Sequence, residues 1–306
     1  MNTKPSVLIV GITGTLGSKV ARAILDKGIM SVKALVRSSS QNSERVKSLS
    51  DRGVTIADGD LSDLSSLQNA CKGSAAVIST VRGGNSETSE QETMLTGQLN
   101  LIEAAKSAGV QRFIPSDFAI DYFKIAPEDN YNLNFRIQIA EALKQSGLQY
   151  TFVLNGVFTE VLVSPFLKIF DLQSGIFRYW GDGETLFDTT TFDDTAKYLA
   201  EAIVDREFAD RPLRIAGDTL TLKQLHADYE AATGKTLMVE RLGTIEELKQ
   251  WIDRKKQTAT SHFEYLPEQY QYVTFSGKGK LDTLDNDRYP HIQPATVKQF
   301  LARSSL

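Results

Sequence analysis

The chain has few of the residues on which several common kinds of site depend. Only one of its 306 residues is a cysteine, Cys71, so the chain forms no internal disulfide and fits a reducing compartment. The histidines His226, His262 and His291 are far apart in the sequence and lack the spacing of metal ligands. We therefore expect no metal site.

Long apolar runs and basic clusters are also lacking. The first apolar run, Val7–Val10, lies between Pro5 and Gly11 and is too short for the core of a signal peptide. No later run is long enough to span a bilayer. The formal net charge is −4 and no basic stripe occurs, which argues against a nucleic-acid surface. We expect a soluble, cytoplasmic protein with no nucleic-acid or membrane partner.

Short β-branched apolar runs alternate with amphipathic stretches through the first half of the chain. The predicted strands are Val7–Val10, Val32–Val36, Val54–Ala57, Ala75–Thr80, Arg112–Pro115 and Tyr150–Leu154. The predicted helices are Leu16–Lys27, Ser43–Ser50, Leu64–Cys71, Gln91–Ser107 and Asn134–Gln145. Because the strands are apolar throughout, they indicate a parallel sheet covered on both faces, which is the doubly wound α/β or Rossmann fold.

This alternation breaks after Leu154. A helix at about Thr195–Val204, a strand at Leu213–Gly217 and a helix at Thr221–Gly234 are predicted next, and aromatic-rich loops such as His262–Phe275 follow. We predict two lobes. The first is a Rossmann lobe of residues 1–155 with a returning segment at about 186–216. The second is a smaller α+β substrate-binding lobe of residues 156–185 and 217–306.

The stretch after the first strand is typical of a dinucleotide site. Gly11, Gly14 and Gly17 follow the strand and open a helix, where glycines permit a tight turn and close approach to a pyrophosphate. The spacing G-x-x-G-x-x-G departs from G-x-G-x-x-G, so the signal comes from the strand–helix context. The predicted contacts also include the intervening residues Thr13, Thr15 and Leu16.

The end of the second strand bears on the choice of cofactor. NAD-specific enzymes usually have an acidic residue there, whereas this chain has Arg37 followed by Ser38. A guanidinium suits a 2′-phosphate, so NADP(H) is favoured over NAD(H). Arg45 and Lys47 either assist or belong to a solvated helix face.

Further cofactor contacts are predicted after the third and fourth strands. Asp60 and Leu61 are placed to bracket an adenine. The alternative is a helix cap, a role that Ser62 or Asp63 could fill instead. Thr80, Val81 and Arg82 follow the fourth strand along the cofactor edge.

Several motifs together resemble the NmrA-like group of atypical short-chain dehydrogenases, and in particular its isoflavone reductase and phenylcoumaran benzylic ether reductase branch. They are GITGTLG, LVR, GDLSD, QLNLIEAAKSAGVQRFIPSDF, QYTFVLNGVF, GDG and RYP. The resemblance implies an NADPH-dependent reductase of phenolic substrates. It also implies that Ser116, Asn155 and Phe158 contact the cofactor or the substrate.

The resemblance places the catalytic lysine of this branch at Arg136. On a helix, Arg136 shares the apolar face of Ile139, Ala140 and Leu143. Because an arginine keeps its proton, its role would be electrostatic, and the proton would come from another group such as Tyr131. Two alternatives are a structural ion pair of Arg136 with Asp117, Glu128 or Asp129, and a shifted alignment that puts Lys124 in the catalytic position.

Two functions from different classes follow. One is an NADPH-dependent reductase of a small, aromatic metabolite with a phenolic, quinone or enone group. The other is a redox-sensing regulator of the NmrA type, which binds NAD(P) and a protein partner without turnover. A homodimer is compatible with both functions.

Overall fold

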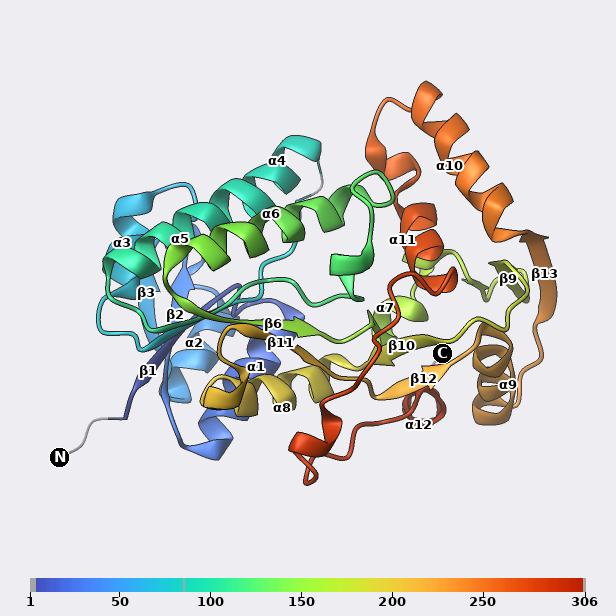
Figure 1. The fold of residues 1–306 in the computed structure, drawn as a ribbon. Coiled ribbons are helices and arrows are strands. Elements are labelled where there is room, and N and C mark those ends of the chain that lie inside the picture. The colour runs from blue at the N-terminus through green and yellow to red at the C-terminus, as the bar shows by residue number, and fades with distance from the viewer. Residues whose placement is uncertain (1–3, 85, 305–306) are drawn as a thin grey trace. The chain divides into compact units, whose positions relative to one another are not determined.

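The computed structural model describes residues 4–84 and 86–304, and the chain divides into two compact units (Figure 1). Unit 1 consists of Met1–Asp117, Phe135–Val153 and Ala196–Leu213, and unit 2 of Phe118–Asn134, Leu154–Thr195 and Arg214–Leu306. The predicted lobes differ from these units in residues 118–134 and 186–195, and at two boundaries in residues 154–155 and 214–216. All four segments were predicted in the Rossmann lobe, but they cluster with unit 2.

Unit 1 contains a seven-stranded parallel sheet, as the alternation predicted, in the order β11-β6-β5-β4-β1-β2-β3. Its strands are β1 (Ser6–Val10), β2 (Ser31–Val36), β3 (Thr55–Asp58), β4 (Ala76–Ser79), β5 (Arg112–Ile114), β6 (Gln149–Leu154) and β11 (Arg211–Arg214). The order reverses between β1 and β4, and ligands of such sheets bind at this reversal, beyond the carboxyl ends of the strands. The predicted strand Leu213–Gly217 begins two residues earlier and ends at Arg214.

Helices cover both faces of this sheet, which explains why its central strands are apolar throughout (Figure 1). They are α1 (Thr15–Lys27), α2 (Glu44–Asp51), α3 (Leu64–Cys71), α4 (Glu87–Gln91), α5 (Gly97–Ser107), α6 (Tyr131–Ser146) and α8 (Phe192–Ala202). In Figure 1, α3, α5 and α6 lie on one face and α1, α2 and α8 on the other. The predicted helix Gln91–Ser107 is interrupted, because a π-helical turn, η2 (Glu92–Thr96), precedes α5.

Unit 2 is built on two three-stranded sheets, in the orders β12-β10-β7 and β13-β9-β8. The strands are β7 (Val157–Phe158), β8 (Phe170–Asp171), β9 (Ile176–Trp180), β10 (Phe187–Thr190), β12 (Asp218–Leu220) and β13 (Met238–Gly243). The helices are α7 (Thr159–Leu162), α9 (Leu222–Thr233), α10 (Ile245–Thr258), α11 (Leu266–Phe275) and α12 (Val297–Arg303). A core that includes Phe177, Phe187, Leu225 and Tyr229 joins the sheets to the helices.

The prediction of aromatic-rich loops across His262–Phe275 is wrong, because Leu266–Phe275 forms α11. Pro267 lies in the first helical turn, where a missing N–H costs no hydrogen bond. All but one of the side chains of α11 are buried, including the polar residues Glu268, Gln269 and Gln271, so polar residues do not mark a solvent-exposed face of this helix in the sequence.

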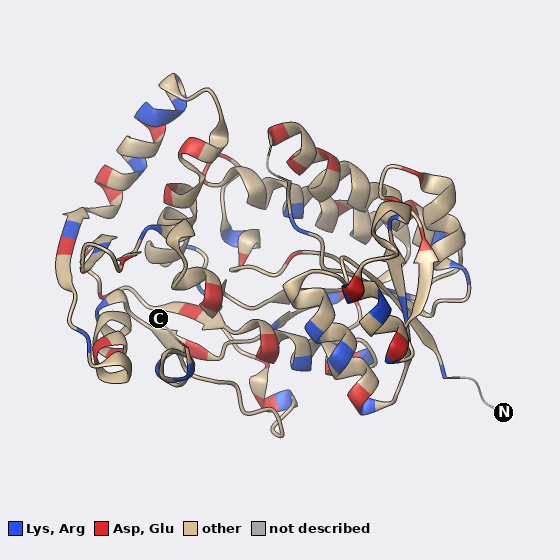
Figure 2. Ribbon diagram, turned by 180° about the vertical axis from the view of Figure 1, so that it is seen from behind, with Lys and Arg blue, Asp and Glu red and all other residues tan. Residues whose placement is uncertain are grey.

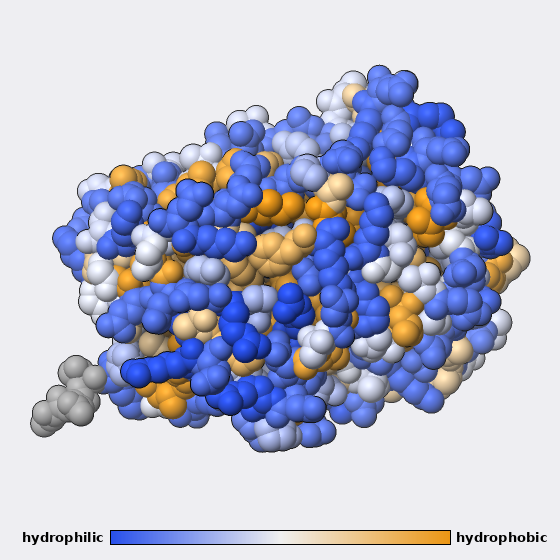
Figure 3. Space-filling model, in the orientation of Figure 1, coloured by the Kyte–Doolittle hydropathy of each residue, from blue (hydrophilic) through white to orange (hydrophobic). Residues whose placement is uncertain are grey.

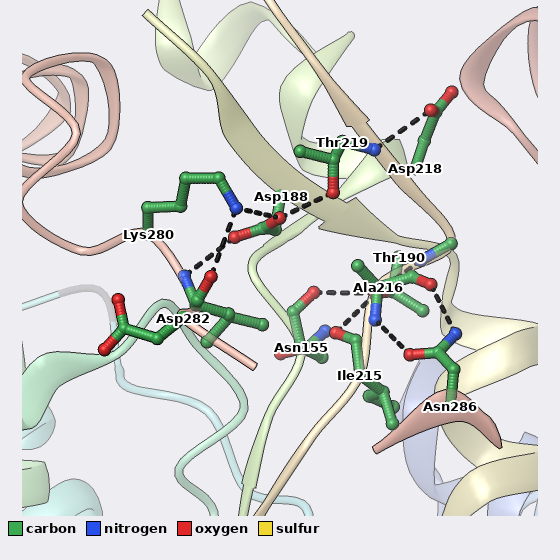
Figure 4. Close-up of polar contacts among 12 residues, drawn as sticks. Asn155, Asp188, Thr190, Ile215, Ala216, Asp218, Thr219, Lys280, Asp282 and Asn286 are labelled. Atoms are coloured by element: carbon green, nitrogen blue, oxygen red, sulfur yellow. Dashed lines mark hydrogen bonds and ion pairs between the residues drawn. The ribbon is translucent and has the colours of Figure 1, made fainter. Parts of the chain in front are cut away.

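A buried carboxylate ties the segment after α11 to the sheet β12-β10-β7 (Figure 4). Asp188 is 2% exposed and accepts hydrogen bonds from Lys280 Nζ (3.2 Å), Leu281 N (2.8 Å) and Thr219 Oγ1 (2.7 Å). Asn286 adds a second tie by donating from Nδ2 to Ala216 O (2.7 Å) and accepting from Ala216 N (3.1 Å). These contacts compensate for the burial of the Asp188 charge.

Residues of both charge signs are intermixed along the ribbon (Figure 2). On the face drawn in Figure 3, hydrophilic side chains cover most of the surface and hydrophobic ones form smaller areas between them. No helix within residues 4–84 and 86–304 is long and apolar enough to cross a membrane. The same residues contain no group of three histidine, cysteine, aspartate or glutamate side chains arranged to hold a metal ion.

Candidate functional site

The turn after β1 and the first turn of α1 each have a position, Gly11 and Gly17, that can hold only glycine. Gly11 has φ +83°, and a Cβ atom on it would lie 2.8 Å from the backbone carbon of Thr80. A Cβ atom on Gly17 would lie 2.4 Å from Gly11 O. The turn therefore packs backbone against backbone, which leaves its outer side open for a close approach by a phosphate.

Gly14 occupies the N-cap position of α1, with a hydrogen bond from its N–H to Gly11 O of 2.9 Å. Within the described part of the chain, no side chain caps this helix. The first N–H groups of α1, from Thr15 onwards, thus lie at the positive end of a helix whose cap position has no competing side-chain acceptor. This arrangement suits an anionic group such as a pyrophosphate.

Thr80 and Ser116 hold the ends of β4 and β5 at the reversal of strand order. Thr80 donates to Val10 O from its backbone N–H (2.8 Å) and from its hydroxyl (2.9 Å). Ser116 donates from Oγ to Val81 O and from its backbone N–H to Gln98 Oε1, which lies 3.2 Å away. Three of the predicted contact residues, Thr80, Val81 and Ser116, therefore take part in hydrogen bonds beside the glycine turn. The buried side chain of Gln98 holds Ser116 in place.

The end of β2 combines positive and negative side chains. Arg37 begins the 3₁₀ turn η1 (Ser38–Ser40), and Ser38 Oγ donates to Asp58 at 2.8 Å from Oδ1 and 2.9 Å from Oδ2. Arg45, from α2, donates to Thr13 O in the glycine turn. Arg45 therefore contacts the glycine turn in addition to solvent. Asp58, at the end of β3, also lies at this site, and the sequence pattern did not identify it.

Asp60 and Leu61 follow β3 and are both fixed by local contacts. Asp60 Oδ1 accepts from Ser62 N (2.9 Å) and Ser62 Oγ (2.7 Å), and these hydrogen bonds lower the pKa of Asp60, as does the charge of Arg37. Asp63 caps α3, so Asp60 is not needed for that role. Leu61 O accepts from Asn100 Nδ2 at 2.9 Å, which anchors Leu61 to α5.

Tyr131 is placed in unit 2 by two contacts at the start of α6. Its ring is stacked on the His262 ring, with 3.9 Å between centroids and 22° between planes. Its backbone N–H donates to Gln269 Oε1 at 3.1 Å. His262 is 4% exposed and Gln269 is 1% exposed, so Tyr131 rests on a buried and polar support. The sequence did not identify His262 as a candidate, because it lies far from Tyr131 along the chain and only the fold brings the two rings together.

The remaining candidates in unit 2 are held in different ways. Lys124 donates to Asp282 Oδ1 (2.6 Å) and to Lys280 O (2.7 Å), so proton transfer by Lys124 would require this ion pair to break. Asn155 is fully buried and accepts from Thr190 Oγ1 at 2.7 Å (Figure 4). Phe158 packs on Phe192, with 4.2 Å between centroids. A contact of Asn155 or Phe158 with the cofactor therefore remains a prediction.

Arg136 lies on α6 where the periodicity placed it. Ile139, Ala140 and Leu143 are buried at 1%, 1% and 0% exposure, while Arg136 is half-buried. The guanidinium thus lies at the border of an apolar face and keeps its positive charge. Of the anions suggested as its partners, Asp129 accepts from Lys278 at 2.9 Å, and Asp117 Oδ1 accepts from Val153 N at 3.3 Å.

The chain is similar to known proteins over nearly its whole length. Residues 3–301 match the NmrA-like family. A phenylcoumaran benzylic ether reductase of Nicotiana tabacum is 32% identical over 78% of this chain and 77% of its own length. An isoflavone reductase homologue of Zea mays is 30% identical over 98% of both chains. The structure of a leucoanthocyanidin reductase from Vitis vinifera with NADPH aligns with a TM-score of 0.80 and 20% identity over 97% of this chain and 98% of that one, which shows the shared fold.

Proposed function

Because the chain belongs to the NmrA-like family, we propose that it is an NADPH-dependent reductase of a small, aromatic metabolite with a phenolic, quinone or enone group. The observation that carries this proposal is the glycine turn, whose Cβ-free backbone at Gly11 and Gly17 suits a dinucleotide pyrophosphate. The similar proteins of Nicotiana tabacum and Zea mays, named as a reductase and a reductase homologue, support the reaction class.

NADP(H) fits the residues at the carboxyl end of the unit 1 sheet. The N-terminus of α1 would hold the pyrophosphate, and Arg37 with Arg45 would face the 2′-phosphate. Asp60 and Leu61 would border the adenine, and Thr80, Val81, Arg82 and Ser116 would border the nicotinamide half. When bound, NADPH supplies a hydride to an electrophilic carbon of the substrate.

Arg136 would stabilise negative charge on the substrate rather than transfer a proton. A guanidinium donates hydrogen bonds in a fixed fork and stays charged at every pH of interest. Such a group can polarise a carbonyl, hold an oxyanion or anchor a carboxylate, and removing one oxyanion donor from an enzyme typically costs about 100- to 1,000-fold in kcat.

The proton is assigned to Tyr131 or to a water molecule. A phenol can donate a proton and accept it back, and the His262 stack together with the Gln269 contact fixes the direction of Tyr131. Lys124 is the weaker candidate because of its ion pair with Asp282. The alternative function, a regulator without turnover, is not favoured, because the relatives described above bear the names of reductases.

The test is NADPH oxidation, followed by absorbance, against a panel of phenolic, quinone and enone compounds, with NADH as the comparison. Wild type, Arg136→Lys and the control Arg22→Lys would be measured together, since Arg22 is an exposed arginine of α1 in the same unit. We expect turnover by wild type and by Arg22→Lys, and a kcat about 10- to 100-fold lower in Arg136→Lys.

Other outcomes would correct specific parts of the proposal. Tight NADPH binding without turnover in wild type, with activity gained in Arg136→Lys, would indicate a reductase fold that serves as a sensor. Equal kcat values in wild type and Arg136→Lys would remove Arg136 from the mechanism while leaving the reductase function in place. Absence of dinucleotide binding would refute the proposed function.

A further inference from the structure

A carboxylate lies where a 2′-phosphate site is expected to be positive. Val36 and Asp58 are register partners in the parallel pair of β2 and β3, so the ends of the two strands are adjacent. Both carboxylate oxygens of Asp58 lie within 2.9 Å of Ser38 Oγ. Ser38 directly follows Arg37, the residue assigned to the 2′-phosphate. The hydrogen bonds with Ser38 therefore hold the negative charge of Asp58 close to the expected 2′-phosphate site.

The charges of the four side chains around the ends of β2 and β3 balance. Arg37 and Arg45 contribute two positive charges, while Asp58 and Asp60 contribute two negative ones. The charge of Arg37 acts on Asp60, whose pKa is lowered mainly by the hydrogen bonds from Ser62 and further by Arg37. A site that selects NADPH by its 2′-phosphate binds that phosphate better when positive charges are in excess. These four side chains have no excess of positive charge.

We propose that Asp58 weakens the preference of this site for NADPH over NADH. This inference rests on the proposed function, because it assumes that the site binds a dinucleotide. The charge of Asp58 opposes a 2′-phosphate, which carries nearly two negative charges at neutral pH. The same carboxylate has about four acceptor positions, and the Ser38 hydroxyl uses only part of them, so Asp58 can also accept from the 2′-hydroxyl of NADH.

The effect should be measurable but moderate. Asp58 and Ser38 are exposed, so water and salt screen the interaction. For one unit charge and a phosphate within about one Debye length in such surroundings, the expected change is about three- to tenfold in Kd. A tenfold change corresponds to about 1.4 kcal/mol.

The test measures the Kd of NADPH and of NADH by fluorescence titration, so it does not depend on a substrate. Asp58→Asn removes the charge and retains the shape. Ser38→Ala keeps the charge and removes the hydroxyl. Asp26→Asn makes the same change in net charge near the far end of α1, about 16 Å along the helix from Thr15. Thermal unfolding of each variant confirms that it is folded.

We expect Asp58→Asn to lower the Kd of NADPH about three- to tenfold and to leave the Kd of NADH equal or higher. The gain should shrink as salt is raised from 50 mM to 500 mM, while Ser38→Ala and Asp26→Asn should give no gain. An unchanged ratio of the two Kd values in Asp58→Asn overturns the inference, and so does an equal gain in Ser38→Ala. In both cases the dinucleotide site itself stands, whereas failure of wild type to bind either dinucleotide refutes the inference together with the proposed function.

Discussion

Gly17→Ala is expected to destabilise unit 1 and to weaken dinucleotide binding, whereas Gly14→Ala is expected to weaken binding alone. The added methyl group at Gly17 would lie 2.4 Å from Gly11 O, 2.6 Å from Thr80 Oγ1 and 2.8 Å from Ile12 Cα. Two of these atoms belong to the backbone, so the turn must shift to accept the methyl group. At Gly14 the nearest atom, Gly11 O, would be 3.2 Å away, which a small movement relieves.

The magnitude for Gly17→Ala is set by two opposing effects. Replacing a helical glycine by alanine contributes about 1 kcal/mol of stability through helix propensity. Overpacking of a buried position costs about 1–3 kcal/mol, and more where backbone atoms must move. Because backbone atoms must move at Gly17, we expect the cost to reach at least about 3 kcal/mol and the net loss at least about 2 kcal/mol, which lowers Tm by about 2–4 °C for each kcal/mol in a domain of this size.

The assay combines thermal unfolding with titration of NADPH. Gly17→Ala should show a lower Tm and a Kd at least about tenfold higher, because the turn that faces the pyrophosphate is displaced. Gly14→Ala should unfold near the wild-type temperature and still bind more weakly, because its methyl group stands at the N-cap of α1. A Gly17→Ala protein with wild-type Tm and Kd would refute the reasoning from close backbone packing. Wild-type binding by Gly14→Ala would show that the phosphate does not approach this cap.

Two further predictions concern stability. Asp188→Asn should lower the free energy of unfolding by about 2–4 kcal/mol in urea titrations, somewhat less than the loss of a fully buried pair because Lys280 is 30% exposed. The control Asp282→Asn, at a side chain that is 75% exposed, should leave the free energy of unfolding close to that of wild type, and equal losses in the two variants would contradict the argument. Burial raises the pKa of Cys71 to about 11 from 9.0, so its thiol should react with a disulfide reagent at pH 8 only after unfolding. The folded state holds the Cys71 proton more tightly than the unfolded state does. The protonated thiol therefore adds its full share to the free energy of unfolding below pH 9, and this share, about 3 kcal/mol, is lost as the pH rises towards 11. Cys71→Ala should lack that loss in urea titrations at pH 8 and pH 10.5, and an identical pH dependence in wild type and variant would refute it.

Local patterns were sufficient for most of unit 1. The strands β1 to β6 lie within one or two residues of their predicted positions, because burial on both faces selects continuous apolar runs. The glycine turn and the buried face of α6 were also readable, since both depend on spacings of three or four residues. Unit 2 was harder to predict. The polar residues of α11 are buried together with its apolar ones, so the pattern of Leu266–Phe275 does not separate a buried from an exposed helix face.

The amino-acid sequence by itself determined the elements of unit 1, the glycine turn that suits a dinucleotide, and the position of Arg136 on its helix. Only the tertiary structure decided which distant side chains meet. Ser38 reaches Asp58 because β2 and β3 pair with Val36 beside Asp58, and Tyr131 stacks on His262 through the packing of unit 2. Residues 118–134 cluster with unit 2, where Asp121 N donates to Gly279 O at 2.9 Å. Spacing along the chain encodes periodic burial, whereas contacts between distant residues depend on strand register and packing, which no single segment specifies.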